Sequence, residues 1–153
     1  MLDHLLIAPR IVLLARPESP NGRLATLLQH VGGATLTTVA APAALVPQLQ
    51  AEPADLVVLD LGLQTAGDWA LLRSVRAAVP PDTYLPILLV ADELSAPAKW
   101  QAIAAGVSDF LTHPFDPVEV ILRVGNLLDT RALHLQLQQQ MGHFAPGVDA
   151  APR

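Results

Sequence analysis

The sequence alternates short apolar segments with segments of helical spacing, and this alternation constrains its fold more than any other feature. Runs rich in leucine and β-branched residues predict five strands, the second being the weakest, at 11–15, 35–39, 55–60, 86–91 and 108–112. Apolar spacing and flanking Gly and Pro residues predict helices over about 22–31, 42–50, 69–79, 98–105 and 117–140. Five consecutive β-then-α units predict an α/β fold, a doubly wound five-stranded parallel sheet with helices on both faces and an extended C-terminal helix.

The residues that directly follow the predicted strands are the first candidates for a functional site. In open parallel sheets the functional crevice lies beyond the carboxyl ends of the strands. Arg16, Asp60, Asp92 and His113 occupy these positions after the first, third, fourth and fifth strands. We therefore expect these four side chains to share one edge of the sheet.

Composition excludes several classes of protein. The 153 residues fit one domain with a short appendage, and 52% apolar content is too high for a disordered chain. Nine basic against 14 acidic residues, with Lys99 as the one lysine, argue against a nucleic-acid-binding surface. The absence of cysteine excludes disulfides and thiolate zinc sites. No apolar run is long enough to span a membrane and residues 1–10 lack the features of a secretory signal, which predicts a soluble cytoplasmic protein with no membrane partner.

Three segments resemble the receiver domain of bacterial two-component response regulators. Residues 105–116, AGVSDFLTHPFD, are similar to the family's fifth-strand signature, and 56–60 and 85–90 match its third and fourth strands. The resemblance covers 10–128 and implies the strand order 2-1-3-4-5. It divides the chain into a lead at 1–9, a receiver at 10–128, an extended, coiled-coil-like connector at 129–141 and a flexible tail at 142–153.

The resemblance implies that Asp60 is the position of the phosphoacceptor aspartate. Receivers hold Mg²⁺ there with an acidic pair and a backbone carbonyl, which correspond to Ala15, Arg16 and Gly62. Carboxylate attack on a phosphoryl group needs a divalent cation, and magnesium prefers hard oxygen ligands. Because both acids of the pair are missing, we expect no cofactor, and at most weak Mg²⁺ binding at Asp60.

Other receiver positions are altered as well. Ala91 stands where the family has a hydroxyl residue, Asp92 where it has a small residue, and His113 where it has the lysine that contacts the phosphoryl group. Phe110 matches the aromatic switch residue and is expected to be fixed in the core or in an interface. Two readings of Arg16 remain open: its guanidinium pairs with the Asp60 carboxylate in place of the metal, or it is a solvated loop residue.

The last predicted helix carries a stripe of apolar residues that predicts a homodimer. Ile121, Leu128 and Leu135 recur every seven residues, as in helices that pair with a partner helix. The segment 123–138 also resembles the connector that follows receivers with cyclic-dinucleotide output domains. The alternative is that the helix packs back on its own domain.

Two functions follow from the resemblance. The first is a degenerate receiver, not an enzyme, that acts through protein contacts and dimerisation without phosphate control. The alternative is a phosphorylatable receiver that accepts a phosphoryl group on Asp60 from a histidine kinase. A histidine kinase or another signalling protein is the expected partner beside a second copy of the chain.

Overall fold

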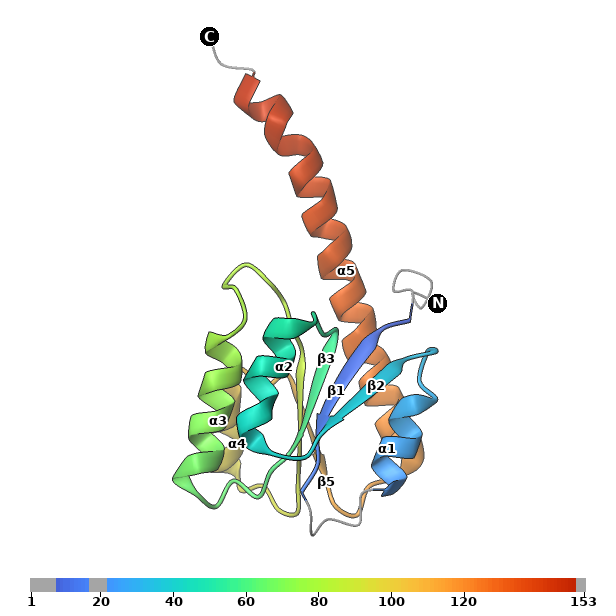
Figure 1. Cartoon of the computed structure of the whole chain (residues 1–153), viewed down its shortest axis with the longest axis vertical. Coiled ribbons are helices and arrows are strands. Elements are labelled where there is room, and N and C mark those ends of the chain that lie inside the picture. The colour runs from blue at the N-terminus through green and yellow to red at the C-terminus, as the bar shows by residue number, and fades with distance from the viewer. Residues whose placement is uncertain (1–7, 17–21, 151–153) are drawn as a thin grey trace.

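The fold is a five-stranded parallel sheet covered by helices on both faces (Figure 1). The computed structural model describes residues 8–16 and 22–150, with side chains described over 8–16 and 23–141. The strand order is β2-β1-β3-β4-β5, as the resemblance implied, and every strand begins and ends within one residue of its predicted range. The strands are β1 (Arg10–Leu14), β2 (Thr35–Val39), β3 (Leu56–Asp60), β4 (Ile87–Ala91) and β5 (Asp109–Thr112).

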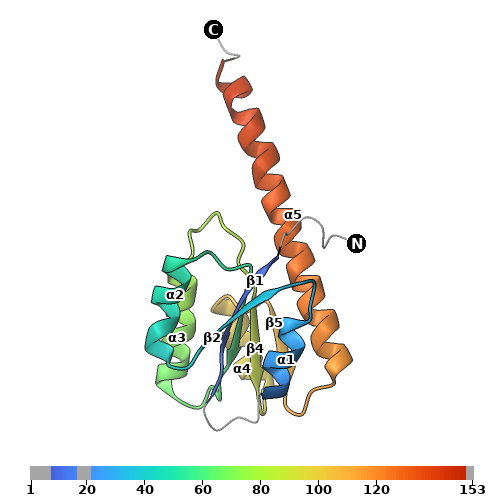
Figure 2. The ribbon, with the colours of Figure 1, turned by 45° about the vertical axis from the view of Figure 1, so that its right-hand side comes forward.

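The helices divide between the two faces of the sheet, as Figures 1 and 2 show. Alternate residues of β1, β3 and β4 point to opposite faces and contribute to two separate cores, which explains why these strands are apolar throughout. The described helices are α1 (Gly22–Gln29) and α5 (Pro117–Ala150) on one face, and η2 (Pro42–Ala44), α2 (Leu45–Ala51), α3 (Ala66–Ala77) and α4 (Ala96–Ala104) towards the other. Among the described residues, no helix combines the length and hydropathy needed to cross a membrane.

Side-chain hydrogen bonds cap the N-termini of α3 and α4, the helices that follow β3 and β4. The Thr65 hydroxyl accepts a hydrogen bond from the Asp68 amide at the start of α3, and Ser95 accepts one from Ala98 at the start of α4. Such caps satisfy backbone N–H groups that have no partner inside the helix. They fix where the loops after β3 and β4 end.

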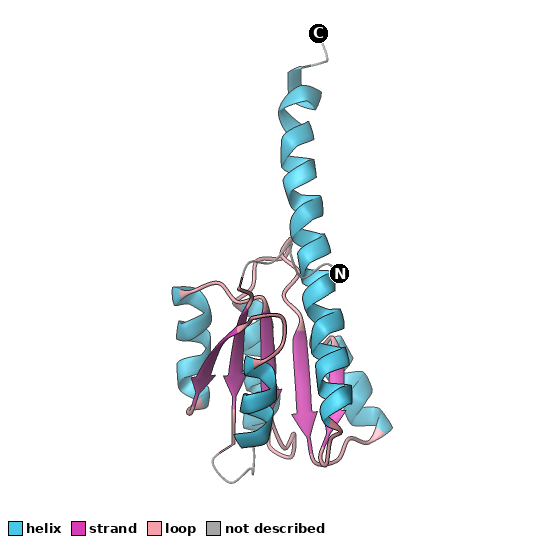
Figure 3. Cartoon of the chain, turned by 90° about the vertical axis from the view of Figure 1, so that its right-hand side faces the viewer, coloured by secondary structure: helices cyan, strands magenta, loops and turns pink. Residues whose placement is uncertain are grey.

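Helix α5 is longer than the sequence predicted. It continues to Ala150, whereas the sequence predicted its end near 140 and a flexible tail from 142 onward. Extending an existing helix gains one hydrogen bond for each residue with a backbone N–H, so a segment without apolar periodicity can still continue it, although Pro146 supplies no such donor. Figure 3 shows α5 running along the sheet and projecting past it, at the end opposite to the carboxyl ends of the strands. Residues 151–153 of the predicted tail, and 1–7 of the predicted lead, lie outside the described residues.

Side-chain contacts tie α5 to the loop between α3 and β4, and to Asp55 before β3, well beyond residue 128, the predicted boundary of the receiver. We call these contacts the clasp. Arg131 is 7% exposed and donates hydrogen bonds to the Tyr84 carbonyl (2.8 Å) and to Asp55 Oδ1 (3.3 Å). The Tyr84 ring stacks on His134 at 4.3 Å between centroids, and Gln138 Nε2 donates to the Asp82 carbonyl at 2.6 Å. The folded domain therefore includes α5 at least as far as residue 138.

This packing corrects the predicted dimer stripe. Leu128 is 6% exposed and lies in the core beneath α5, Leu135 is partly buried, and only Ile121 of the three is exposed. Residues seven apart stay on nearly the same side of a helix, and at Leu128 and Leu135 that side is turned towards the domain. The exposed apolar residues of the extension are instead Leu133, Leu137 and Met141. At 100° per residue their mean direction lies about 90° around the helix from that of Arg131, His134 and Gln138, beside the clasp.

Candidate functional site

The four residues predicted to form a site meet at the carboxyl edge of the sheet. Parallel pairing aligns Leu14 with Leu59 and Asp60 with Val90, so the ends of β1, β3 and β4 lie side by side. Arg16 follows β1, Asp60 is the last residue of β3, and the other two follow β4 and β5. The four residues therefore share one edge of the sheet, as the rule for parallel sheets led us to expect.

Arg16 is bound to the Asp60 carboxylate. Asp60 has no exposed surface, and its Oδ1 accepts a hydrogen bond from Arg16 Nε at 3.1 Å. A buried carboxylate is strongly destabilising unless a cation or hydrogen-bond donors compensate it. Of the two readings that the sequence left open, the geometry corresponds to the ion pair and not to a solvated loop arginine.

The same guanidinium also binds Asp92 at the end of β4. Arg16 Nη2 donates to Asp92 Oδ1 at 3.1 Å and Nη1 to Oδ2 at 3.4 Å, a two-pronged contact. The hydrogen bond to Asp92 is the main cause that raises the pKa of Arg16, while its burial opposes this. Conversely, the hydrogen bond from Arg16, followed by its charge, lowers the pKa of the exposed Asp92 carboxyl. One cation thus bridges the carboxylates at the ends of β3 and β4.

The second oxygen of Asp60 faces His113. His113 Nε2 lies 3.5 Å from Asp60 Oδ2, and both atoms are buried without a hydrogen-bond partner. The His113 backbone amide donates to the Ala91 carbonyl at 2.9 Å, and a cis peptide bond links His113 to Pro114. The imidazole therefore occupies the place of the receiver lysine, close to the carboxylate but without a hydrogen bond to it.

Asp68 belongs to the same region, although the sequence analysis did not include it. Its Oδ2 accepts a hydrogen bond from the Leu63 amide at 2.9 Å, where Leu63 has a φ of 57°. A Cβ added at Gly62 would meet Asp68 Oδ2 and Arg16 Nη1 only at ordinary contact distance, so the loop is not closed tightly around this glycine. The sequence pattern that could have indicated Asp68 is Thr65-Ala-Gly-Asp68, in which a helix-capping residue is followed three positions later by an acidic residue.

A cavity of about 340 Å³ opens beside the Arg16–Asp60 pair, on the side of β1 and β3. Its lining includes Ala15, Arg16, Asp60, Thr65 and Asp68. The methyl group of Ala15 and the guanidinium of Arg16 supply no oxygen ligand on the β1 side.

The residues present at this edge do not fit Mg²⁺. Magnesium requires several oxygen ligands around one centre. Asp60 Oδ1 is bound to Arg16, Asp92 is bound to the same guanidinium, and Asp68 is bound to a backbone amide. Among the side chains described over 8–16 and 23–141, no group of three or more His, Asp or Glu residues is arranged to hold a metal ion.

The two remaining receiver positions lie on either side of the site. Ala91 is fully buried at the end of β4 and offers no hydroxyl to a ligand. Phe110 of β5 is partly buried and packs against the core beneath α3 and α4. Phe110 thus lies at the margin of the core, and that it is fixed there or in an interface stays a prediction.

The chain is similar to response regulators in sequence and in fold. No protein-family model matches it. It is 28% identical over 134 residues to the transcriptional regulatory protein BaeR of Escherichia coli O6:H1, which covers 86% of this chain and 53% of BaeR. The chain spans about half, or less, of the length of the curated relatives it matches first.

Solved structures agree on the fold. The receiver domain of a sensor histidine kinase from Pseudomonas aeruginosa, which holds a magnesium ion in its active-site cleft, aligns with a TM-score of 0.66 at 19% identity and covers 80% of this chain and 98% of that one. A response regulator from Thermotoga maritima aligns with a TM-score of 0.67 at 19% identity, with coverages of 80% and 98%.

Sheet order, the location of the site and these similarities together define a receiver-like domain of the kind found in two-component response regulators. Ala15 and Arg16 occupy the positions that the receiver resemblance assigns to the metal-binding acids, and Asp60 occupies the position that it assigns to the phosphoacceptor.

Proposed function

We propose that the chain is a degenerate receiver, a signalling module that acts through protein contacts rather than through phosphate control. The observation that carries this proposal is the Arg16 Nε–Asp60 Oδ1 contact of 3.1 Å at a carboxylate with no exposed surface. The arginine stands where a receiver would bind its metal, so the Asp60 carboxylate is already paired with a cation of the protein itself. Such a module has no catalytic role of its own and needs no cofactor.

Arg16 is a poor substitute for Mg²⁺ in phosphoryl transfer. The metal neutralises charge on both the attacking carboxylate and the transferred phosphoryl group. Arg16 carries one positive charge and shares it between Asp60 and Asp92, so the cluster of three side chains has a net charge of −1 if both acids are ionised. An incoming phosphoryl group would meet the Asp92 carboxylate instead of a free cation.

Incubation with phosphoramidate and Mg²⁺, read by intact-protein mass spectrometry, tests the proposal. We expect no phosphoryl adduct on the native chain and an adduct on the Ala15→Asp/Arg16→Asp variant, which restores the acidic pair. The matched control adds Asp60→Asn to that variant and should lose the adduct again. Ready phosphorylation of the native chain, abolished by Asp60→Asn, would refute phosphate independence.

A second candidate function is a phosphorylatable receiver, and one observation favours it. Asp60 Oδ2 has no hydrogen-bond partner and could serve as the nucleophile. In that reaction Oδ2 would attack the phosphorus of a kinase phosphohistidine, the P–N bond would break, and the departing imidazole would take up a proton. Oδ2 is also buried, so His113 or the loop after β3 would have to move first. The phosphoramidate experiment distinguishes the two candidates.

The proposed contacts include a homodimer through α4 and α5. Trp100 and Ile103 of α4 are 75% and 57% exposed, and Val118, Ile121 and Leu122 of α5 are also exposed. Apolar side chains gathered on two helices that flank the edge strand β5 are typical of an interaction surface. A histidine kinase or another signalling protein is the alternative occupant. That the chain binds no nucleic acid and resides in the cytoplasm stays a prediction from composition.

A further inference from the structure

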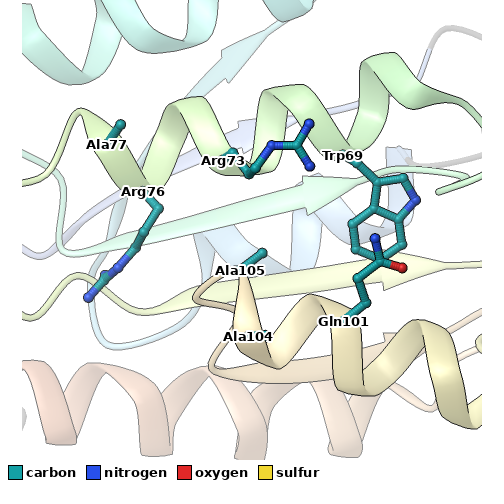
Figure 4. A pocket seen from close by; sticks show the side chains of 7 residues that line it. All are labelled: Trp69, Arg73, Arg76, Ala77, Gln101, Ala104 and Ala105. Carbon is teal, nitrogen blue, oxygen red and sulfur yellow. The ribbon is translucent and has the colours of Figure 1, made fainter.

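A second cavity lies between α3 and α4, on the face of the sheet that carries α2 (Figure 4). Its volume is about 490 Å³, and α3 and the C-terminal end of α4 line it with Trp69, Arg73, Arg76, Gln101, Ala104 and Ala105. None of the residues of the Arg16–Asp60 site contributes to it. We call it the α3–α4 groove.

The two arginines of this groove form no ion pair, a feature that, among the described side chains, they share with Arg23 of α1. Arg10, Arg16, Arg123 and Arg131 each form an ion pair with a carboxylate. Over the described side chains, neither Arg73 nor Arg76 has a carboxylate within ion-pair distance, although the chain carries a net charge of −5. The two positive charges lie three residues apart on one helix, where like charges repel each other. A bound anion would remove that repulsion.

The groove also contains the indole ring of Trp69, which lies on the same helix as the two arginines. Trp69, Arg73 and Arg76 follow one another at i, i+4 and i+7, so the arginines lie about 6 Å and about 10 Å along the helix axis from the tryptophan. In Figure 4 the Trp69 ring and the Gln101 amide project into the groove from the two helices, and the Arg73 guanidinium extends towards the tryptophan end. Arg76 reaches the other way, with its stem against Gly106.

We propose that the α3–α4 groove binds a nucleotide, with the base against Trp69 and the phosphates on Arg73, the arginine that extends towards the tryptophan. An indole offers a stacking face to any base, and a guanidinium binds phosphate oxygens in pairs. The Gln101 amide supplies both a donor and an acceptor for the edge of a base. A volume of about 490 Å³ lies within the range of about 300–1,000 Å³ that is common for small-ligand sites. No carboxylate lines the groove to repel a phosphate.

Fluorescence titration with ADP tests this site in the intact chain. Trp100→Phe leaves Trp69 as the one tryptophan, so its quenching reports on the groove directly. We expect saturable quenching by ADP, and weaker binding of pyrophosphate and of adenosine, because each retains only part of the ligand. Arg73→Gln should weaken ADP binding about tenfold or more, as expected for a charged hydrogen bond to phosphate. Arg23→Gln, which removes an exposed arginine from α1, is the control and should change nothing.

Four outcomes would overturn the proposal. The first is that ADP neither quenches Trp69 nor gives binding heat. The second is that pyrophosphate binds as tightly as ADP, which would leave the indole without a role. A hexaglutamate peptide could bind with the same dependence on Arg73 while ADP does not, which would make the groove a peptide site. A change in sedimentation with Arg73→Gln would instead indicate a second copy of the chain. Circular dichroism of each variant confirms that it is folded before any result is counted.

Discussion

Arg16 Nε lies 3.1 Å from Asp60 Oδ1, and the carboxylate it binds has no exposed surface. In a receiver the same carboxylate would be compensated by a metal ion that binds and dissociates. Here the compensating cation is a side chain of the domain itself and is present permanently.

Removing Arg16 should destabilise the fold because it leaves Asp60 buried and uncompensated. We expect Arg16→Ala to lower the free energy of unfolding by about 2–4 kcal/mol, somewhat less than for a fully buried pair because Arg16 is partly exposed. Asp60→Asn should cost less in the Arg16→Ala background, since no charge is left without a partner. Urea unfolding of the four proteins of this double-mutant cycle measures the coupling.

Arg10→Ala is the control for that cycle. Arg10 pairs with Glu52 at 2.6 Å, but both side chains are more than half exposed, so its loss should cost at most about 1 kcal/mol. Equal losses for Arg10→Ala and Arg16→Ala, or no coupling between Arg16 and Asp60, would contradict the ion-pair account.

The lowered pKa of Asp92 predicts that this carboxyl contributes to the pH dependence of the free energy of unfolding at acidic pH. A carboxyl whose pKa is lower in the folded state contributes stability above its ordinary pKa of about 3.9 and loses it as the pH falls through the folded-state value. Asp92→Asn removes this contribution, so its free energy of unfolding should fall less steeply than that of the native chain below about pH 4. Chemical unfolding measured at a series of pH values tests this. Parallel curves for the two proteins would show that the Arg16–Asp92 contact is absent in solution.

The clasp on α5 predicts that Arg131 stabilises the domain although it lies beyond the predicted receiver boundary. Arg131→Ala would leave Asp55 Oδ1 and the Tyr84 carbonyl without the donor that Arg131 supplies, at a cost of about 2–4 kcal/mol. Arg123→Ala, which breaks a more exposed pair with Asp109, should cost less. Hydrogen exchange over 130–138 should rise in the first variant and not in the second. Unchanged exchange in Arg131→Ala would mean that the extension is not held by this contact.

The proposed homodimer predicts that exposed and buried apolar residues of α5 respond differently to substitution. Ile121→Asp and Ile103→Asp should shift the chain from dimer to monomer in analytical ultracentrifugation at tens of micromolar, while circular dichroism stays native. Leu128→Asp should unfold the domain, because Leu128 lies in the core. Point variants are preferable to a chain ended at residue 129, since that truncation would also remove the Arg131 clasp. A native chain that sediments as a monomer at this concentration would contradict the dimer.

The sequence predicted the strands well and the long helix poorly, for physical reasons. Buried strands such as Leu56–Asp60 are specified by local apolar runs, which are visible without the structure. The clasp joins Arg131 to Tyr84 and Asp55, residues 47 and 76 positions away, and no local pattern signals such a contact. Without knowledge of these contacts, the spacing of Ile121, Leu128 and Leu135 predicts a surface for a partner helix.

The candidate site was predictable only in part. The end-of-strand rule and the receiver resemblance identified Arg16, Asp60, Asp92 and His113. That Arg16 would bind both carboxylates at once depends on side-chain direction and on the alignment of β3 with β4. The tie between Asp68 and the Leu63 amide depends in turn on the backbone of one loop.

The most direct test of the central claim, that Arg16 replaces the metal at Asp60, is the binding of beryllofluoride with Mg²⁺, a mimic of the phosphorylated state. Isothermal titration and nuclear magnetic resonance shifts near Asp60 and Phe110 would be measured for the native chain and for Ala15→Asp/Arg16→Asp. Our account predicts no saturable binding by the native chain at Mg²⁺ concentrations of a few millimolar, and binding by the variant with the restored acidic pair. Saturation of the native chain below about 1 mM Mg²⁺, as expected for a competent metal site, would contradict it.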